Sequence, residues 1–378
     1  MRWDWKATLG VAISALLIWW VLRGVDAAAV WGELRRANWW LLLAAVAVAT
    51  SGFVVRALRW KIFLHPIRAG TRFRARFAAV NIGFAANNLL PARVGEFARA
   101  WAISKLEPVS VSGAVGSLVV ERFLDAVAIF LLLLVALLHP SFPGNATVGG
   151  RPIGDALLVV AGAMALVLVA LTLLVAFPRL LVRFTEWVVR VVPDRVGRTL
   201  RETVDAFLTG LGALQDPRLL LRGLAWSVGF WAWNAVSFWL AFQAFGIEQG
   251  YVTALFVQAI IALGVAVPSA PGFFGTFHAA AVVGLQEVYG VGGSATLAFA
   301  FGYHLGGFIP VTLMGLWYAG QLGLTLREVG RADEVVASEM DRPEGRQPND
   351  LGGVSPPDVR AEAGRAGSEE PEAKGDGS

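Results

Sequence analysis

The sequence contains no cysteine, and only 16% of its 378 residues are charged. Without thiols the chain has no disulfide framework, no thiolate metal site and no cysteine nucleophile. Its four histidines, His65, His139, His278 and His304, are too far apart in the sequence to indicate a zinc cluster. A soluble domain has about 25% charged residues. This composition excludes a disordered chain or a zinc module and indicates surroundings other than water.

Long hydrophobic runs are what the sequence has in abundance. Hydrophobic residues make up 56% of the chain, and its mean hydropathy is +0.60. A helix needs roughly 20 apolar residues to cross a bilayer core. Six segments meet this length: 5–22, 39–58, 112–138, 155–177, 219–245 and 294–322. The sequence therefore predicts an all-α fold, a polytopic integral membrane helical bundle.

The distribution of positive charge predicts how the spans are oriented. Residues 56–76 contain seven lysines and arginines, whereas residues 139–154 contain only Arg151. Because cytoplasmic loops carry the excess of such residues, 56–76 should be cytoplasmic. The basic connection at 178–218 agrees, and it is expected to be an amphipathic helix on the cytoplasmic face or an ordinary connecting helix. Both termini are then cytoplasmic, in a multi-pass protein of the cell (inner) membrane.

The composition changes near Arg327. Residues 327–378 hold 7 Lys/Arg and 13 Asp/Glu and almost no large apolar side chains. Such a segment buries too little apolar surface to offset its ordering entropy. We therefore divide the chain into a transmembrane domain at 1–326 and a disordered, acidic cytoplasmic tail at 327–378.

Two hydrophobic stretches, 77–106 and 251–289, are interrupted by proline and glycine. Both contain a proline, three residues, a glycine, one residue and a phenylalanine, beginning at Pro91 and at Pro271. Three predicted spans lie between the stretches, so the second would have the opposite orientation. This pattern predicts two inverted repeats, each with a broken, re-entrant helical hairpin, as in transporters with a midplane site. The repeats would run from about 39 to 138 and from about 219 to 322, and the alternative is two proline-kinked hairpins that only pack.

The first interrupted stretch carries charged residues directly after its proline. Arg93, Glu96 and Arg99 are three residues apart, so they share about one side of a helix. Charges at the centre of a bilayer cost at least ~2.5 kcal/mol each and face a cavity or each other. With Asn87 and Asn88 ahead of them, they are expected to hold an anionic headgroup. The alternative is that these charges are solvated at the cytoplasmic surface.

The third predicted span contains further charges. Glu121 and Asp125 are four residues apart on one helix face, with Arg122 beside them. The two carboxylates are expected to pair with Arg93 and Arg99 across packed helices, or to carry protons. The alternative is that they reach water at the membrane interface.

The second interrupted stretch supplies the rest of the predicted substrate site. Pro271, Gly272 and Gly275 break the segment, and His278 follows them. His278 and His304, which lies within the last span, titrate near neutral pH and are expected to couple transport to protons. The alternative is that both are hydrogen-bonded packing residues.

Motifs typical of enzymes are lacking. The sequence has no glycine-rich phosphate loop with a lysine, no serine in a nucleophile elbow and no metal-ligand spacing. We therefore expect no enzymatic activity, no cofactor and no metal. Nucleic acid is not an expected partner either, because the basic residues flank apolar runs.

Three motifs in order resemble a known family. They are Asn87-Asn88-Leu-Leu-Pro91-Ala-Arg93-Val-Gly95-Glu96-Phe-Ala-Arg99, then Glu121-Arg122-Phe-Leu-Asp125, then Pro268-Ser-Ala-Pro271-Gly272-Phe-Phe-Gly275. Together they resemble the flippase-like family that matches the transmembrane region of lysylphosphatidylglycerol synthases. That family usually has an acidic residue where this chain has His278. The resemblance covers roughly residues 5 to 325 and implies a role in handling lipids.

The leading hypothesis from the sequence is a membrane-embedded lipid translocase that moves an anionic, aminoacylated or polyprenyl-linked lipid between leaflets. Its partner would be a membrane lipid with an anionic or zwitterionic headgroup. The alternative is a non-catalytic membrane subunit, or scaffold, that supplies lipid to a separately encoded glycosyl- or aminoacyl-transferase.

Overall fold

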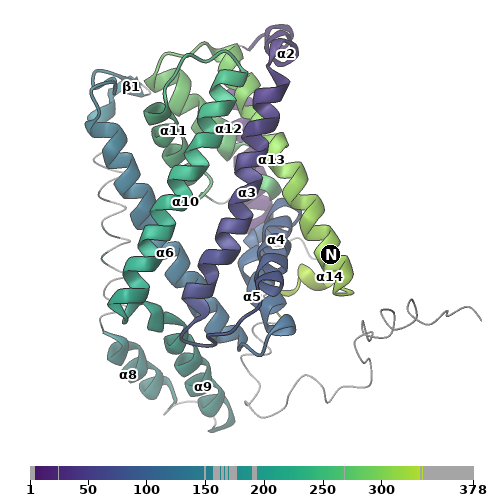
Figure 1. Cartoon of the computed structure of the whole chain (residues 1–378), viewed down its shortest axis with the longest axis vertical. Helices are drawn as coiled ribbons and strands as arrows, with labels where there is room; N and C mark the ends of the chain where they lie inside the picture. The colour runs from purple at the N-terminus through teal and green to yellow at the C-terminus, as the bar shows by residue number, and fades with distance from the viewer. Residues whose placement is uncertain are drawn as a thin grey trace, which may run out of the picture. The chain divides into compact units, whose positions relative to one another are not determined.

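The computed structural model is almost entirely helical (Figure 1). It describes residues 5–23, 25–148, 150–155, 162, 166, 169, 177–189, 194–267, 269–332 and 334. Its helices before residue 140 are α1 (Trp5–Leu22), α2 (Ala27–Arg36), α3 (Trp39–Leu64), α4 (Phe73–Leu89), the 3₁₀ turn η1 (Pro91–Arg93), α5 (Gly95–Leu106) and α6 (Val111–Leu138). Two short antiparallel strands follow, β1 (Thr147–Val148) and β2 (Arg151–Pro152).

The second half of the chain continues the helical pattern. It contains α8 (Pro178–Val189), α9 (Asp194–Gly210), the 3₁₀ turn η2 (Leu211–Leu214), α10 (Pro217–Ala244), α11 (Tyr251–Gly264), the 3₁₀ turn η3 (Pro271–Phe273), α12 (Thr276–Ala281), the π-helix η4 (Val282–Val288), α13 (Gly293–Gln321) and α14 (Leu326–Val329). The predicted all-α fold is confirmed. The predicted tail at 327–378 falls almost wholly outside the described residues.

Five of the six predicted spans coincide with helices, namely α1, α3, α6, α10 and α13. The sixth, 155–177, lies almost wholly outside the described residues. In the described part of the chain, two helices are long and apolar enough to cross a membrane, α3 and α13. Residues Thr8–Leu22 of α1 and the helix α2, bent by 85°, form a third candidate span if they are taken together. The structure therefore contains candidate membrane spans, but fewer that qualify by length and composition than the six predicted.

Helix α3 is longer than predicted. Its start is capped by Asn38, whose side chain accepts hydrogen bonds from the N–H groups of Trp40 and Leu41. It ends at Leu64 rather than at residue 58, shortly before Pro66, which has no N–H to continue the helical hydrogen bonds. The last turns of α3 therefore belong to the bundle and not to a loop.

The same order of elements occurs twice. A long helix, a second helix, a 3₁₀ turn beginning at a proline, a shorter helix and another long helix form both α3–α6 and α10–α13. The four long helices α3, α6, α10 and α13 run together, with α11 and α12 toward one end and α4 and α5 toward the other (Figure 1). Helix α3 packs on α10, α4 packs on α13, and α6 packs on α11.

Both predicted interruptions are real breaks in the helices. The first is η1, where Arg93 adopts a left-handed backbone with φ of 56°. The second is η3, where Gly272 and Phe273 have φ of 70° and 61°, followed by Gly275 at 92°. The turns η1 and η3 contact each other, although 177 residues lie between Arg93 and Pro271 along the chain. The two breaks therefore meet inside the bundle.

The connection at 178–218 contains two amphipathic helices, so the expectation of a single helix is wrong. Pro193 lies between α8 and α9 and lacks the N–H that a continuous helix requires. Helix α9 packs on α6 through glycine: a Cβ atom on Gly210 would lie 2.4 Å from the carbonyl oxygen of Gly113. The connection is therefore attached to the bundle.

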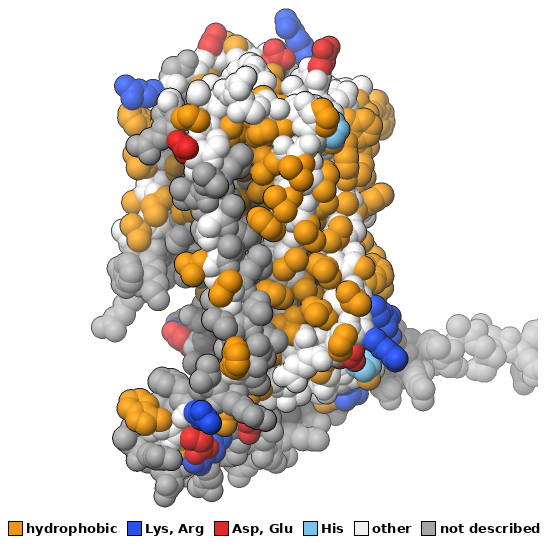
Figure 2. Space-filling model, turned by 90° about the vertical axis from the view of Figure 1, so that its left-hand side faces the viewer, with side chains coloured by type: hydrophobic (Ala, Val, Ile, Leu, Met, Phe, Trp, Pro, Cys, Tyr) orange, Lys and Arg blue, Asp and Glu red, His pale blue; other side chains and the backbone are white. Residues whose placement is uncertain are grey.

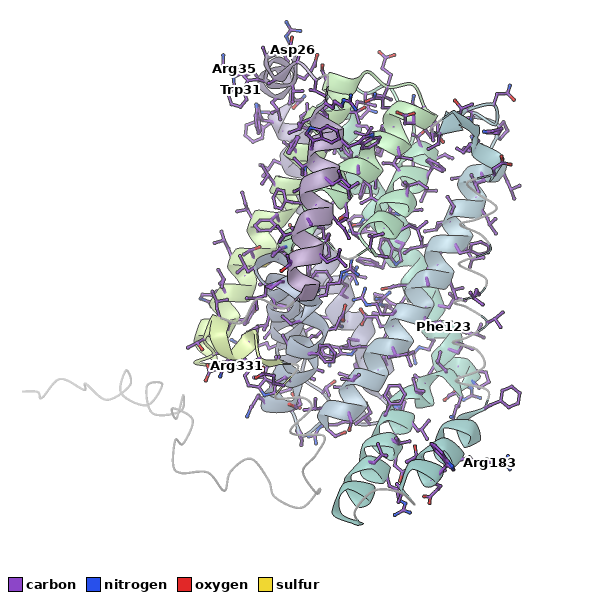
Figure 3. The ribbon with its side chains drawn as sticks, turned by 180° about the vertical axis from the view of Figure 1, so that it is seen from behind. Asp26, Trp31, Arg35, Phe123, Arg183 and Arg331 are labelled. Carbon is purple, nitrogen blue, oxygen red and sulfur yellow. The ribbon has the colours of Figure 1, made fainter. Side chains whose placement is uncertain are left out.

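The surface is apolar between its ends. On the face shown in Figure 2, most charged side chains gather toward the two ends, with hydrophobic side chains between them. Asp26, Trp31 and Arg35 lie at one end, and Arg183 and Arg331 lie toward the other (Figure 3). Several tryptophans are exposed, as an interfacial belt requires: Trp19, Trp31, Trp39, Trp40, Trp187, Trp226 and Trp317. Trp60, which the sequence places near a span end, is instead completely buried.

Candidate functional site

Five charged side chains meet inside the bundle. Helix α3 contributes Arg56 and Arg59, α5 contributes Arg99, and α6 contributes Glu121 and Asp125. All five are buried, and we refer to them as the ionic cluster. Because a buried charge is stable only when it is paired and hydrogen-bonded, the partners of each member decide what the cluster does.

Four of the five charges form a closed network. Arg99 binds Glu121 through two hydrogen bonds, of 3.0 and 2.8 Å. Arg59 NH2 lies 3.1 Å from the same carboxylate, and its guanidinium also makes two hydrogen bonds to Asp125. Paired bonds of this kind are among the strongest that proteins make. The network connects α3, α5 and α6.

Neutral side chains complete the network. Arg59 donates to the hydroxyl of Ser227 over 2.9 Å, and the indole N–H of Trp231 donates to Asp125 over 3.0 Å. The ring of Trp60 lies 4.0 Å from the guanidinium carbon of Arg99, and its N–H donates to Ser117. Helix α10 therefore contributes polar partners to a cluster whose charges come from the first half of the chain.

Arg56 is the member that the network does not satisfy. Its NH1 lies 3.5 Å from Glu121 and 3.7 Å from Asp125, yet it makes no hydrogen bond to any residue that the structure describes. The guanidinium carbon lies 4.2 Å from the centre of the Phe230 ring, a cation–π contact. Since the cluster has three arginines and two carboxylates, one positive charge is left over. Only 9% of the Arg56 side chain is exposed, compared with 0% for Arg59 and 1% for Arg99.

Helix spacing and close packing place these side chains together. Glu121 and Asp125 are one turn apart on the same face of α6. Helix α5 approaches α4 closely because glycines face each other: a Cβ on Gly95 would lie 2.1 Å from the carbonyl oxygen of Gly83. A Cβ on Gly83 would lie 2.8 Å from the Cβ of Arg99. These glycines therefore determine how far Arg99 reaches toward α6.

The structure brings together some of the predicted site residues and separates others. Arg99 pairs with Glu121, as the spacing predicts, but the expected pairing of Arg93 with these carboxylates is wrong. Arg93 instead donates to the carbonyl of Val267 over 3.2 Å. Arg93 is the last residue of η1 and lies beside the second break, because η1 packs against η3. Glu96 lies outside the ionic cluster and belongs to a separate, partly exposed ion pair.

That pair joins two further predicted residues. Arg122 lies 3.0 Å from Glu96, and both side chains are about 40% exposed, at 42% and 38%. Their charges balance, and an exposed pair of this kind contributes little to stability. The ionic cluster therefore keeps its one excess positive charge when this pair is included.

The two asparagines stabilise the first break. The side-chain oxygen of Asn87 accepts from the backbone N–H of Gly95 over 2.9 Å, across the break. Asn88 donates to the hydroxyl of Thr312 over 2.8 Å and so ties α4 to α13. Both asparagines therefore have a structural role in this fold, and their role in binding a headgroup stays a prediction.

The second break is lined by aromatic and imidazole rings. His278 is completely buried, and neither ring nitrogen has a hydrogen-bond partner among the residues described. Its ring centre lies 5.2 Å from that of His304 and 5.8 Å from that of Phe274. The expectation that both histidines are hydrogen-bonded packing residues is therefore wrong for His278. Pro271 starts η3, and Gly272 has a left-handed backbone within it. Gly275, which follows η3, also has a positive φ and packs against Ser14 of α1.

Sequence reasoning missed Arg56 and Arg59. Both were counted among the charges of a cytoplasmic segment, whereas α3 carries them into the bundle. Arg56 lies within the predicted span 39–58, and that span alone places it on a helix. The signal that extends the helix to Arg59 is Pro66, because no helix-breaking residue occurs between position 58 and that proline. In the described ranges, no group of three or more His, Asp or Glu side chains is arranged to hold a metal ion.

Comparison with known proteins assigns the chain to a family. The family described as the lysylphosphatidylglycerol synthase TM region matches residues 7–315, which include both breaks and the ionic cluster. The chain belongs to this family. As a member of the lysylphosphatidylglycerol synthase TM region family with candidate spans of its own, it is a multi-pass membrane protein.

Two curated relatives are UPF0104 membrane proteins of Methanothermobacter thermautotrophicus. One is 25% identical over 341 residues, covering 82% of this chain and 93% of the relative. The other is 24% identical over 284 residues, covering 72% of this chain and 82% of the relative. The similarity to each relative therefore extends over most of this chain and most of the relative.

Proposed function

We propose that this chain is a lipid translocase that moves a lipid with an anionic phosphate headgroup between the leaflets of the cell membrane. The observation that carries the proposal is the excess positive charge of Arg56 inside the bundle. A buried arginine with a donor nitrogen left without a partner is costly, and a phosphate oxygen would satisfy it. A phosphodiester carries one negative charge, which would neutralise the ionic cluster.

The accessibility of Arg56 supports this role. Arg56 is the most exposed of the three cluster arginines, with 9% of its side chain exposed compared with 0% for Arg59 and 1% for Arg99. The aromatic rings around it hold the guanidinium without neutralising its charge. The family name refers to synthases of lysylphosphatidylglycerol, a lipid that contains one phosphodiester beside the amines of its lysyl group, and the phosphodiester is the part that Arg56 would bind.

The arrangement of the two halves supports alternating access. The elements α3–α6 and α10–α13 have the same order, and α4 packs on α13 as α11 packs on α6. The two broken segments lie toward opposite ends of the long helices and meet at their breaks (Figure 1). We infer that they are inverted repeats with re-entrant hairpins, a construction that places substrate sites near the midplane. Both termini would be cytoplasmic.

A scrambling assay tests the proposal. Purified full-length protein is reconstituted with fluorescent phosphatidylglycerol, phosphatidylcholine or a polyprenyl-phosphate analogue, and dithionite reports the lipid in the outer leaflet. The variant is Arg56→Met, and the control is Arg74→Met, which removes an exposed arginine outside the cluster. We expect Arg56→Met to slow transport of the anionic lipid by about tenfold or more, as loss of a charge-assisted hydrogen bond implies.

The stability of the same variant separates binding from folding. Because Arg56→Met leaves two arginines and two carboxylates, the cluster becomes neutral, and the free energy of unfolding should not fall. Normal transport by a folded Arg56→Met protein would contradict the proposed role of the excess charge. Wild-type protein that binds phosphatidylglycerol without moving it would contradict translocation. That outcome would favour a non-catalytic subunit supplying lipid to a separate transferase.

A further inference from the structure

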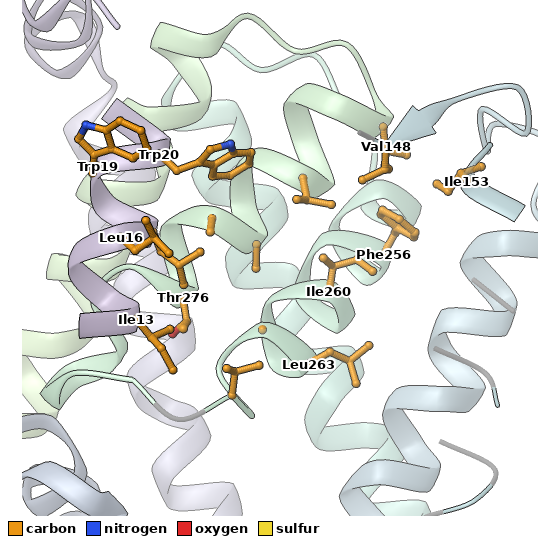
Figure 4. A pocket seen from close by; sticks show the side chains of 17 residues that line it. Ile13, Leu16, Trp19, Trp20, Val148, Ile153, Phe256, Ile260, Leu263 and Thr276 are labelled. Carbon is orange, nitrogen blue, oxygen red and sulfur yellow. The ribbon is translucent and has the colours of Figure 1, made fainter. Parts of the chain in front are cut away.

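An apolar groove lies beside the second break, outside the ionic cluster. It has a volume of about 770 Å³ and lies between α1 on one side and α11, α12 and η4 on the other, with the β1–β2 hairpin at one end (Figure 4). Ile13, Leu16 and Trp20 of α1 face Ile260 and Leu263 of α11 across it. Its volume is within the range of sites that hold lipid-sized molecules.

The lining is almost entirely apolar. Thr276 is the one residue with a polar side chain among those that line it, except for the indole N–H groups of Trp19 and Trp20. The hydroxyl of Thr276 already donates to the carbonyl of Phe273 over 3.1 Å. An occupant of the groove therefore gains mainly from apolar contact, as a hydrocarbon chain does.

A positive charge lies at the edge of the groove. The side chain of Val267 lines it, and the carbonyl oxygen of Val267 accepts a hydrogen bond from Arg93. The buried Nε of Arg93 has no partner among the described residues, and the residue is held at φ of 56°. A left-handed backbone is strained for arginine and is typical of functional sites. The edge of the groove thus combines a strained, incompletely satisfied cation with an apolar lining.

Helix α1 is held against the second break. The N–H of Ala270 donates to the hydroxyl of Ser14 over 2.7 Å. Gly10 allows the backbones to approach, because a Cβ there would lie 2.8 Å from the carbonyl oxygen of Ser269. Small residues permit this kind of close packing in membranes. The outer wall of the groove is therefore attached to the segment that carries Val267.

We propose that the groove binds one hydrocarbon chain of the transported lipid while its phosphate lies on Arg93. This inference rests on the proposed function and describes a lipid-bound intermediate of the proposed transport. The groove extends from the level where the breaks meet toward the end that carries the hairpin (Figure 4). A lipid with its headgroup at the breaks and its chain in this groove has the same orientation as a lipid in the leaflet at the opposite end, where α4 and α5 lie. The bound lipid is then an intermediate of transport, with its headgroup midway between the two ends of the bundle.

Photo-crosslinking in proteoliposomes tests the groove. The probe is phosphatidylglycerol with a diazirine in one acyl chain, and the comparison probe is diacylglycerol with the same labelled chain and no phosphate. The matched variants are Leu16→Trp, which puts a bulky ring at the groove, and Leu313→Trp on α13. The two leucines are equally exposed, at 62% and 61%. Peptide mass spectrometry reports labelling of α1, α11 and α12 relative to α13.

We expect phosphatidylglycerol to label the groove helices more than α13, and more than diacylglycerol does. Leu16→Trp should remove most of this excess, and Leu313→Trp should leave it unchanged. Arg93→Gln should reduce it about tenfold, because a charge-assisted bond to phosphate is lost. Equal labelling by both probes, or equal labelling of α13, would overturn the inference and show ordinary surrounding lipid.

The scrambling assay in the same vesicles separates the two proposals. If wild-type protein moves lipid but the groove shows no excess labelling, the groove inference fails and the proposed function stands. If the groove is labelled through Arg93 but no lipid moves, the proposed function fails and the binding site stands.

Discussion

The two halves of the bundle have the same order of elements but bury different polar groups. Between α3 and α6 they include the ions of the cluster, three arginines and two carboxylates. Between α10 and α13 they are neutral: Ser237 bonds to Tyr303, Asn234 bonds to Gln258, and His278 has no partner among the described residues. One half therefore carries the charge, and the other presents apolar and aromatic surface beside it.

This difference predicts unequal tolerance of substitution. Removing one partner from a buried ion pair leaves a charge without compensation, whereas removing a neutral hydroxyl leaves at most one unsatisfied hydrogen bond. The first half should therefore be sensitive to loss of any network member, and the second half should accept apolar replacements.

The largest expected effect is at Glu121. Glu121→Gln leaves Arg99 and Arg59 without one of their carboxylates, so the free energy of unfolding should fall by about 3–5 kcal/mol. The matched change in the second half is Tyr303→Phe, which removes a buried hydroxyl bonded to Ser237 and should cost about 0.5–1.5 kcal/mol. Thermal and denaturant unfolding in detergent measure both. Equal losses of unfolding free energy in the two variants would show that the charge of the ionic cluster does not determine how much the cluster contributes to stability.

A smaller effect should come from the glycines. In Gly95→Ala the new Cβ meets backbone, 2.1 Å from the carbonyl oxygen of Gly83, and the helices must separate at a cost of about 1–3 kcal/mol. In Gly284→Ala the nearest atom is a side-chain carbon of Val257 at 3.3 Å, which a small adjustment accommodates. We expect a lower unfolding temperature for the first variant and little change for the second. The reverse order would mean that α4 and α5 are not close-packed.

The smallest effect should be at His278. His278→Leu removes a buried ring whose nitrogens have no partner in the described structure, so stability should stay the same or rise by about 1 kcal/mol. In the scrambling assay with dithionite, the His278→Leu variant should move lipid at the wild-type rate if the ring serves only in packing. A loss of pH dependence in transport, with stability retained, would instead identify His278 as a proton carrier.

Much of the fold could be predicted from the sequence because its signals are local. Runs of apolar residues indicate the helices, and Pro91 and Pro271 mark the two breaks, since proline disrupts helical hydrogen bonds wherever it occurs. The spacing of Arg99 after Pro91, and of Glu121 and Asp125 on one helix face, also depends only on helix geometry. For these parts of the site, helical periodicity in the sequence is enough to predict which residues lie together.

The remaining parts depend on which helices pack together. Arg56 and Arg59 resemble loop charges by the rule that assigns arginines at the end of a hydrophobic run to the cytoplasm. Their burial follows from the packing of α3 against α6 and α10, which no local pattern encodes. Arg93 was misplaced for the same reason, because its partner at Val267 belongs to the other half of the chain.

The contact between η1 and η3 has a mechanical consequence. Since the two breaks touch, and Asn88 also ties α4 to Thr312 of α13, a displacement of one break is transmitted directly to the other. The halves then cannot open at both ends at the same time without separating this contact. The same two turns that interrupt the helices therefore also couple the two halves of the bundle.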